Sequence, residues 1–262
     1  MKNEPLPTRT QSIIFRGKAS LLQIKRGVEN LFDLNLKRFS QSINLSEKPK
    51  LAESITPLRT EKEPGEQFLQ AGKIHNLRLV VRKLNGLEVP ANTVFSFWKQ
   101  VGKTTHFRGF VAGRELREGC IIPNIGGGLC QISNALYDAA LKANFEIIER
   151  HAHTQVVRGS LAEQGRDATV FWNYVDLRFK SPNTFQIQAE LDAENLIIRF
   201  RSEKQEEKSL IKIQRLKTQD SKLSTEIGSC ATCGVNDCFR VVKPDKDVLN
   251  FGRTAYLVDE FS

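Results

Sequence analysis

The sequence predicts an α+β domain with a mostly antiparallel sheet, in which one helix follows a glycine-rich turn and further helices lie towards the N-terminus. Two observations support this fold class. Apolar residues recur with helical spacing over residues 18–39, 66–84 and 131–144. Between residues 169 and 200 the spacing shifts towards two, which is typical of half-buried strands. No internal repeat is apparent along the chain.

Residues 1–65 are predicted to form an N-terminal helical segment followed by a linker. The apolar stripe of residues 18–39 predicts a helix despite Gly27. Residues 40–65 contain three prolines and many charges, which favours a linker or an irregular segment. A second helix is expected over residues 66–84, and Asn85-Gly86 is a plausible stop signal. The main domain is expected to cover residues 66–202.

The composition is that of an ordinary globular chain that is long enough to bury a core. The chain has 262 residues, of which 40% are hydrophobic and 26% are charged, and a formal net charge of +9. Such a charge would suit nucleic acid, anionic lipid or an acidic polymer. The Lys and Arg residues are scattered, however, and no nucleic-acid module accompanies them. A solvated basic surface without a specific nucleic-acid partner is the expectation.

The run Gly126-Gly127-Gly128-Leu129-Cys130-Gln131-Ile132-Ser133 places a cysteine in the first turn of the helix predicted over residues 131–144. Unpaired backbone N–H groups and the positive end of the helix dipole favour the thiolate there. Cys130 is therefore a candidate nucleophile. The turn could bind substrate and supply an oxyanion hole, because glycines let backbone donors approach closely. The residues predicted to bind substrate in this turn are Gly126, Gly127, Gly128, Gln131 and Ser133.

Candidate partners for the thiol follow along the chain. If residues 145–157 are extended, His151 and His153 point to the same face, and either could act as the base. Asp167 or Asp176 could then fix the tautomer of the histidine. Arg150 could clamp a substrate carboxylate, although an ordinary salt bridge is the default for such a residue.

Other interpretations of the same residues remain open. A single cysteine is usually a small buried hydrophobe, a triple glycine is usually a turn, and histidines near a strand are more often structural than catalytic. Cys130, His151, His153 and an aspartate could instead bind zinc, although the cysteine is far from the histidine pair in the sequence. The glycine turn could also hold an anion without any nucleophile.

Several motifs follow one another between about Gly72 and Phe200, over about half of the chain. They are Asn92-Thr93-Val94-Phe95-Ser96-Phe97 with Val101-Gly102, Gly109-Phe110 with Ala112, the run from Gly126 to Ser133 with Leu136-Tyr137, Glu149-Arg150-His151 with His153, and Asp167-Ala168-Thr169-Val170 with Asp176-Leu177-Arg178-Phe179. In this order the motifs resemble the VanW family. The resemblance implies a link to bacterial cell-wall metabolism and a cysteine transpeptidase that acts on peptidoglycan stem peptides, with Cys130 as the acyl acceptor and His151 or His153 as its base.

Residues 203–262 are expected to form a C-terminal extension of different composition. Cys230, Cys233 and Cys238 lie within nine positions, and the C-x-x-C spacing fits a zinc knuckle. A tetrahedral site needs a fourth ligand, which would have to come from Asp237, from elsewhere or from another subunit. Reduced thiols or a disulfide are the alternatives. No cofactor is expected for the main domain.

The N-terminus lacks the apolar segment of a secretory signal, and no stretch approaches the roughly 18 apolar residues of a membrane-spanning helix. We therefore expect a cytoplasmic protein without a transmembrane segment. The leading hypothesis is a cysteine-dependent acyl transferase or peptidase whose partner is a small peptide or a cell-wall precursor. The competing hypothesis is a non-catalytic accessory or binding domain that holds an anionic ligand at the glycine-rich turn. Composition leaves the oligomeric state open.

Overall fold

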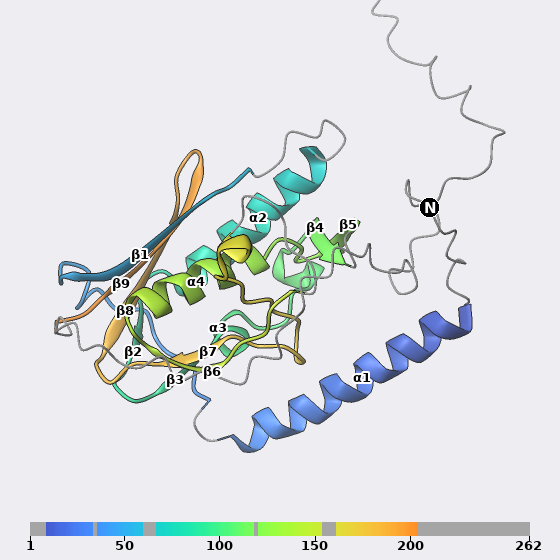
Figure 1. The fold of residues 1–262 in the computed structure, drawn as a ribbon, viewed down its shortest axis with the longest axis horizontal. Helices are drawn as coiled ribbons and strands as arrows, with labels where there is room; N and C mark the ends of the chain where they lie inside the picture. Colours follow the sequence, from blue (N-terminus) through green and yellow to red (C-terminus); the bar gives the residue numbers. More distant parts are fainter. Residues whose placement is uncertain (1–8, 34–35, 60–66, 118–119, 154–160, 204–262) are drawn as a thin grey trace, which may run out of the picture.

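The computed structural model describes residues 9–33, 36–59, 67–117, 120–153 and 161–203 (Figure 1). Within this part the chain folds as an α+β domain, which confirms the predicted fold class. The elements in chain order are α1 (Arg9–Phe32), β1 (Lys50–Pro57), α2 (Gln67–Leu84), β2 (Leu87–Val89), β3 (Val94–Ser96), α3 (Phe97–Val101), the 3-10 helix η2 (His106–Arg108), β4 (Ala112–Arg117), β5 (Cys120–Ile125), α4 (Cys130–Lys142), β6 (Glu146–Glu149), the 3-10 helix η3 (Leu161–Gln164), β7 (Arg178–Lys180), β8 (Phe185–Leu191) and β9 (Asn195–Arg201).

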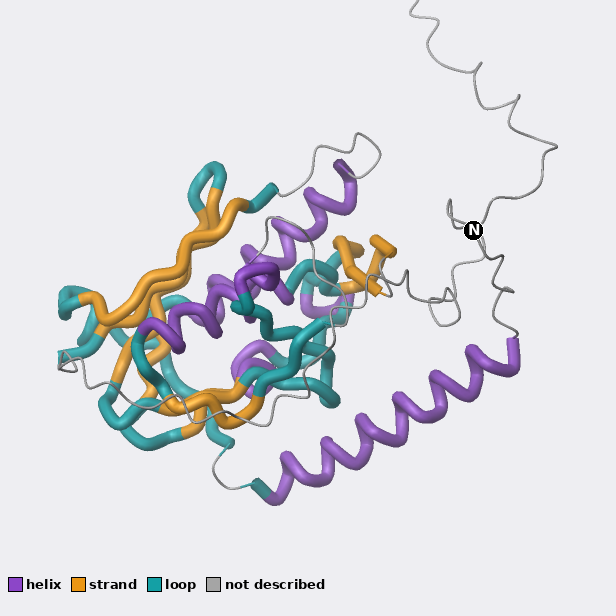
Figure 2. The backbone as a smooth tube through the Cα atoms, in the orientation of Figure 1, coloured by secondary structure: helices purple, strands orange, loops and turns teal. Residues whose placement is uncertain are grey.

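The named strands form three sheets in which neighbouring strands are antiparallel. One sheet has the order β1-β9-β8-β2, a second has the order β3-β7-β6, and β4 pairs with β5. Helix α4 packs against β1 and β9, and helix α2 packs against β8 and β4. Figure 2 shows these two helices surrounded by the strands, whereas α1 lies along the outside of the body.

The core is rich in phenylalanine. Phe145 contacts Phe185 and Phe200, with ring centroids 4.6 Å and 5.3 Å apart, and Phe95 stacks on Phe179 at 4.7 Å. These side chains come from the sheets and from the segment between α4 and β6, so the rings tie the two larger sheets together. Each such aromatic pair contributes about 0.5–1.5 kcal/mol beyond the area that it buries. The end of α4 is thereby held in a rigid setting.

The prediction of a linker over residues 40–65 is wrong for residues 50–57. These residues form β1, an edge strand that pairs with β9 along its length. Its buried positions include Ala52, Ser54 and Thr56, which are small or polar. The strand therefore lacks the alternation of large apolar residues by which a strand is found in a sequence. Pro57 is its last residue, where a missing N–H group is tolerated.

The helix predicted over residues 18–39 corresponds to α1, which ends at Phe32 and not at residue 39. Several of the apolar residues that predicted it are exposed, among them Leu21, Ile24 and Leu31. The helix predicted over residues 66–84 matches α2, and Gly86 follows it with a φ of 80°, as a stop signal requires. In the described part of the chain, no helix has the length and apolar character needed to cross a membrane.

Candidate functional site

The glycine-rich turn lies against α2 and β4 and leads directly into α4. Gly126 and Gly128 have φ values of 80° and 98°, a region that favours glycine. A side chain on Gly127 would overlap the carbonyl of Gly113, and one on Gly128 would overlap the stem of Lys73. The glycines are thus needed for close packing, and this packing determines where α4 begins.

The backbone donors of the turn divide into two groups. Gly126 N–H donates to the Val111 carbonyl at 3.0 Å, and Gly127 N–H donates to the Asn124 carbonyl at 2.8 Å. The N–H groups of Gly128, Leu129 and Cys130 have no acceptor within the described residues. The donors that could contact a ligand therefore lie next to Cys130, whereas those of Gly126 and Gly127 are used inside the protein.

Cys130 is the first residue of α4 and is partly buried. Its Sγ lies 3.6 Å from Thr169 Oγ1 and 3.9 Å from the carbonyl oxygen of Val170. His153 is the neighbour whose charge and side-chain hydrogen bond lower the pKa of the Cys130 thiol. The thiol thus lies close to Thr169, Val170 and His153, and the first two of these belong to the segment that precedes β7.

His153 connects the thiol to Asp167. His153 Nδ1 lies 2.6 Å from Asp167 Oδ1, and the backbone N–H of His153 donates to the other carboxylate oxygen. The side chains of His153 and Asp167 are 17% and 4% exposed. Because Nδ1 faces the carboxylate, Nε2 is the ring nitrogen that remains for the thiol. Cys130, His153 and Asp167 form a continuous chain of side chains, which we call the thiol triad.

The electrostatics of the thiol triad favour an ion pair. Burial alone would raise the pKa of the Cys130 thiol, but the charge of His153 and its hydrogen bond reverse this and lower the pKa. Burial likewise opposes protonation of His153, yet Cys130 and the hydrogen bond to Asp167 raise the pKa of His153 to about 10. Both shifts favour the charged forms, a thiolate facing an imidazolium.

Side chains of α4 hold the segment that carries Asp167. The Ser133 hydroxyl donates to the Ala168 carbonyl at 2.5 Å, and Asn134 Oδ1 accepts from the Ala168 N–H at 2.7 Å. Both residues follow Cys130 on the same helix. The helix that bears the nucleophile candidate thus also positions the carboxylate of the thiol triad. Sequence reasoning assigned Ser133 to substrate binding, but its hydroxyl is used for this internal contact.

Other predicted site residues lie away from the thiol triad. The His151 side chain is half exposed and lies 3.6 Å from Glu149, so the two histidines do not converge on Cys130. The Arg150 guanidinium lies over the Tyr137 ring at 5.3 Å. Gln131 Nε2 donates to Thr56 Oγ1 and to the Pro57 carbonyl. The sequence predicted that His151 and His153 share one face of an extended segment. Strand β6 ends at Glu149, however, so neither histidine belongs to a strand.

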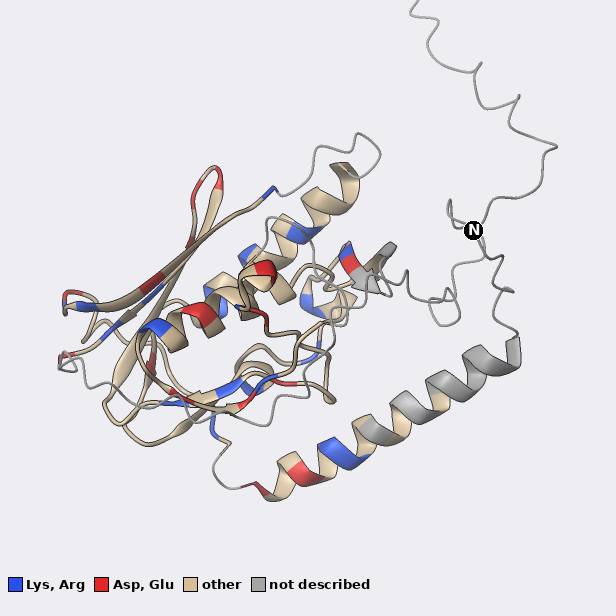
Figure 3. Ribbon diagram, in the orientation of Figure 1, with Lys and Arg blue, Asp and Glu red and all other residues tan. Residues whose placement is uncertain are grey.

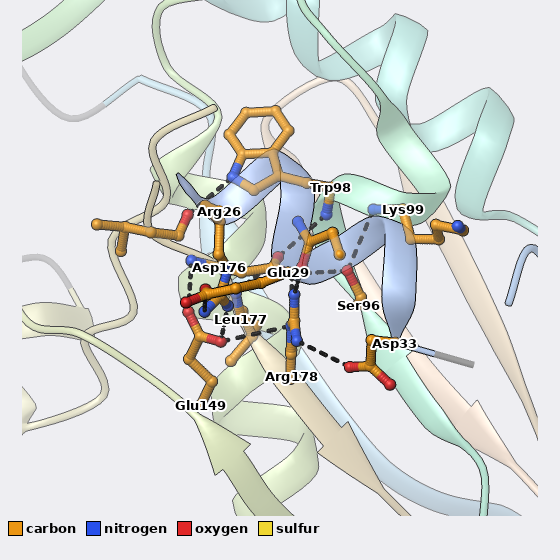
Figure 4. Close-up of polar contacts among 12 residues, drawn as sticks. Arg26, Glu29, Asp33, Ser96, Trp98, Lys99, Glu149, Asp176, Leu177 and Arg178 are labelled. Carbon is orange, nitrogen blue, oxygen red and sulfur yellow. Dashed lines mark hydrogen bonds and ion pairs between the residues drawn. The ribbon is translucent and has the colours of Figure 1, made fainter. Parts of the chain in front are cut away.

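Asp176 belongs to a separate polar cluster beneath α1, shown in Figure 4. Its carboxylate accepts from Ser96 Oγ at 2.6 Å, from the Trp98 N–H at 3.1 Å and from Arg178 Nε at 2.9 Å. Burial raises the pKa of Asp176 despite the hydrogen bonds from Ser96 and Arg178. Arg178 also approaches Glu149 at 3.4 Å. Asp176 therefore orients the start of α3 and the side chain of Arg178, and it does not contact a histidine.

The metal interpretations have different outcomes. Within the described residues, no group of three or more His, Cys, Asp or Glu side chains could hold a metal ion, so the zinc alternative at Cys130 finds no support. Cys230, Cys233 and Cys238 lie outside the described residues, and their zinc site stays a prediction.

Sequence reasoning missed two contributors to the site. Thr169 contacts the thiol, and Asn134 binds the backbone beside Asp167. Thr169 follows Asp167 by two residues, a spacing that places side chains on one side of an extended segment. Asn134 follows Cys130 by four residues, which places it on the same face of α4. Both spacings were visible in the sequence.

The comparisons with known proteins converge on one family. The family model described as VanW like protein matches residues 72–201, which include every residue of the thiol triad. The chain is 32% identical over 147 residues to the vancomycin B-type resistance protein VanW of Enterococcus faecalis, covering 53% of this chain and 53% of that protein. It is 35% identical over 107 residues to the uncharacterized protein YoaR of Bacillus subtilis, covering 41% of this chain and 35% of that protein.

The alignments with these curated relatives span about half of the length of one and about a third of the other. No solved structure gives a significant match to the chain.

Proposed function

This chain belongs to the VanW family, and from that premise we propose that it is a cysteine-dependent acyl transferase or peptidase that acts on cell-wall peptides. The thiol triad is the observation that carries the proposal. The triad contains a nucleophile, Cys130, a base, His153, and a group that orients the base, Asp167. His153 Nδ1 lies 2.6 Å from Asp167 Oδ1. A merely structural cysteine needs neither the histidine nor the carboxylate.

The reaction begins with attack of the Cys130 thiolate on the carbonyl carbon of an amide bond in the substrate. The N–H groups of Leu129 and Cys130 have no acceptor within the described residues, and in this reaction they stabilise the negative charge that develops on the carbonyl oxygen. His153, which carries a proton at neutral pH, donates it to the leaving amine as the C–N bond breaks. A thioester on Cys130 and a free amine result.

The second half of the reaction returns the site to its starting state. An amine acceptor or a water molecule attacks the thioester, His153 takes up the proton that the attacking group loses, and the Cys130 thiolate departs. Attack by an amine gives transfer, and attack by water gives hydrolysis. Asp167 keeps the imidazole in the tautomer that both halves require.

The substrate class rests on two supports. A relative with 32% identity is named a vancomycin B-type resistance protein, and the resemblance to the VanW family implies a link to bacterial cell-wall metabolism. The net charge of +9 also suits an acidic wall polymer, because opposite charge raises the local concentration of a substrate. Lys and Arg lie on many elements of the body in Figure 3, so this attraction would be distributed.

The test is the pH dependence of iodoacetamide labelling at Cys130, read by peptide mass spectrometry. We expect the wild-type half-maximum to lie below the usual thiol value of 9.0, because His153 lowers the pKa of Cys130. His153→Gln should move the half-maximum upward, because burial then raises the pKa of Cys130 without an opposing charge. His151→Gln is the matched control and should leave it unchanged.

Incubation with peptidoglycan stem peptides completes the test. Intact-mass spectrometry should detect an acyl adduct on the wild-type protein that is absent from Cys130→Ser. A Cys130 that is labelled identically in the wild type and in His153→Gln contradicts the nucleophile. In that case, stem-peptide binding that survives Cys130→Ser would indicate the accessory or binding domain instead.

A further inference from the structure

A second site candidate lies at the C-terminal ends of α2 and α3, in a hollow that we call the basic hollow. Its volume is about 420 Å³. Four of its lining residues are cations and none is a carboxylate. The lining residues are Arg38, Phe39, Gln41, Arg82, Lys83, Leu87, Gln100 and Arg108. Cys130, His153 and Asp167 are not among them, so the basic hollow is distinct from the thiol triad.

Backbone carbonyls hold three of the four cations in place. Lys83 Nζ donates to the Val101 carbonyl at 3.0 Å, and Arg108 donates to the same carbonyl at 2.8 Å and to that of Lys103 at 2.7 Å. Arg38 Nε donates to the Lys99 carbonyl at 3.2 Å. These bonds orient the side chains and leave further N–H donors on each of them. They do not neutralise the charges.

The charge of the basic hollow is not balanced by acidic partners. Within the described residues, Arg38, Arg82, Lys83 and Arg108 form no salt bridge, whereas Arg178 and Arg199 each pair with two or more carboxylates. Burial lowers the pKa of Lys83, and the neighbouring charges of Arg108 and Arg38 lower it further. Like charges have therefore been brought together at a cost in free energy.

Helix capping accounts for only part of this arrangement. Cations near the last carbonyls of a helix interact with its dipole, which equals about half an elementary charge at each end. Arg82 and Lys83 stand in the last turn of α2, and α3 has only five residues, so the two helix ends together offer at most about one elementary charge. Four full positive charges exceed what these dipoles can compensate. The excess charge and the hollow together indicate a ligand.

We propose that the basic hollow binds a ligand that carries a phosphate or diphosphate group. Guanidinium groups match phosphate oxygens in a bidentate geometry, and three of the four cations are arginines. A carboxylate would neutralise a single charge, whereas a diphosphate carries several and fits the charge of the hollow. The volume of about 420 Å³ also suits a small ligand. This site is independent of the chemistry proposed for Cys130.

The test uses inorganic pyrophosphate as the probe in isothermal titration calorimetry of the whole chain. We expect saturable binding to the wild type and, for Arg82→Gln, a loss of affinity of about tenfold, since one good charge-assisted contact is worth at least 1.4 kcal/mol. The Arg82 side chain is exposed and forms no hydrogen bond or ion pair within the described residues, so its loss should not disturb folding. Adding Arg108→Gln should weaken binding further.

Arg78→Gln is the matched control, because Arg78 is an exposed arginine of the same helix and is not among the lining residues. Its affinity should stay within about twofold of wild type, as expected for a remote exposed charge. An equal loss in Arg78→Gln and Arg82→Gln would overturn the proposal in favour of diffuse attraction. Absence of saturable pyrophosphate binding to the wild type would also overturn it.

A second arm distinguishes the source of the phosphate group. Sedimentation with phosphatidylcholine vesicles, with and without phosphatidic acid, reports whether the basic hollow binds the phosphate of phosphatidic acid. Binding to the phosphatidic acid vesicles that Arg82→Gln weakens would support a phosphate site that accepts lipid headgroups. Pyrophosphate binding with no such sedimentation would support a soluble phosphate ligand.

Discussion

Asp167 and Asp176 are nine positions apart in the sequence and equally buried, at 3% exposure each, yet the structure uses them differently. Asp167 binds His153, whose pKa is raised by the neighbouring Cys130. Asp176 binds Ser96, Trp98 and Arg178 and has no histidine among its contacts. The same residue type at the same depth therefore binds either the histidine beside the thiol or the framework of the domain, and its partners decide which.

The surroundings of the two carboxylates differ in the same way. Around Asp176, several donors and the positively charged Arg178 converge on one acceptor beneath α1. Around Asp167, the contacts lead towards a partly buried cysteine and the N–H groups at the start of α4. Changes at Asp176 should therefore be felt in stability, and changes at Asp167 should be felt in the reactivity of Cys130.

The largest expected effect is that of Asp176→Ala on stability. The substitution removes the acceptor of the buried Ser96 hydroxyl and the Trp98 N–H, and one of the carboxylates around Arg178. Because several buried donors lose their acceptor, we expect the free energy of unfolding to fall by about 3–5 kcal/mol. Urea unfolding measures this change. Iodoacetamide labelling of Cys130 in the folded fraction should remain as in wild type. A loss below about 1 kcal/mol would show that Asp176 is not an essential acceptor.

Asp167→Ala should have a smaller effect on stability and a clear effect on the thiol. Removing the acceptor of the His153 backbone and ring should cost about 1–3 kcal/mol. The pH of half-maximal labelling of Cys130 should rise, because the hydrogen bond that raises the pKa of His153 is lost. Labelling unchanged from wild type would show that Asp167, like Asp176, contributes to stability and not to the reactivity of Cys130.

The charges of Cys130 and His153 predict a distinctive pH dependence of stability. The contribution of His153 is complete below its usual pKa of 6.5 and is lost as the pH rises towards about 10. The contribution of Cys130 is complete above its usual pKa of 9.0 and is lost as the pH falls through its lowered value. The two slopes oppose each other over the range below 9.0 in which both groups titrate, so their sum should be nearly constant on this plateau.

Urea unfolding of the wild type and of the double variant Cys130→Ser/His153→Gln measures this sum. The difference in unfolding free energy should be on the order of 1 kcal/mol on the plateau and should narrow on either side of it, because partial exposure weakens the pair. A difference that rises steadily with pH across the whole range would rule out an ion pair in the folded protein.

The smallest expected effect is that of Arg26→Gln, which removes the ion pair between α1 and Glu149. Both side chains are partly exposed, so the loss should be about 0.5 kcal/mol. Thermal unfolding measures this change, and Cys130 labelling should not respond. A labelling change here would mean that the Asp176 cluster and the thiol triad are coupled, which the separate contacts of their carboxylates argue against.

Much of the fold and part of the site could be predicted from the sequence. Helical spacing predicted α2 and α4, and the glycine run located the start of α4 and therefore Cys130. Strand β1 could not be found in this way, because its inward residues are small or polar and its pairing with β9 joins residues about 140 positions apart. Local patterns do not contain such long-range pairing.

By itself the sequence determined that a cysteine stands at a helix N-terminus, with histidines and aspartates further along the chain. Which histidine faces the thiol and which aspartate orients it was decided by the tertiary structure. His153, and not His151, lies beside Cys130, and Asp167, and not Asp176, binds this histidine. The reason is that α4 binds the backbone at Ala168, whereas Ser96 and Arg178 bind Asp176 elsewhere. Periodicity depends on neighbours along the chain, whereas a catalytic geometry depends on which distant segments pack together.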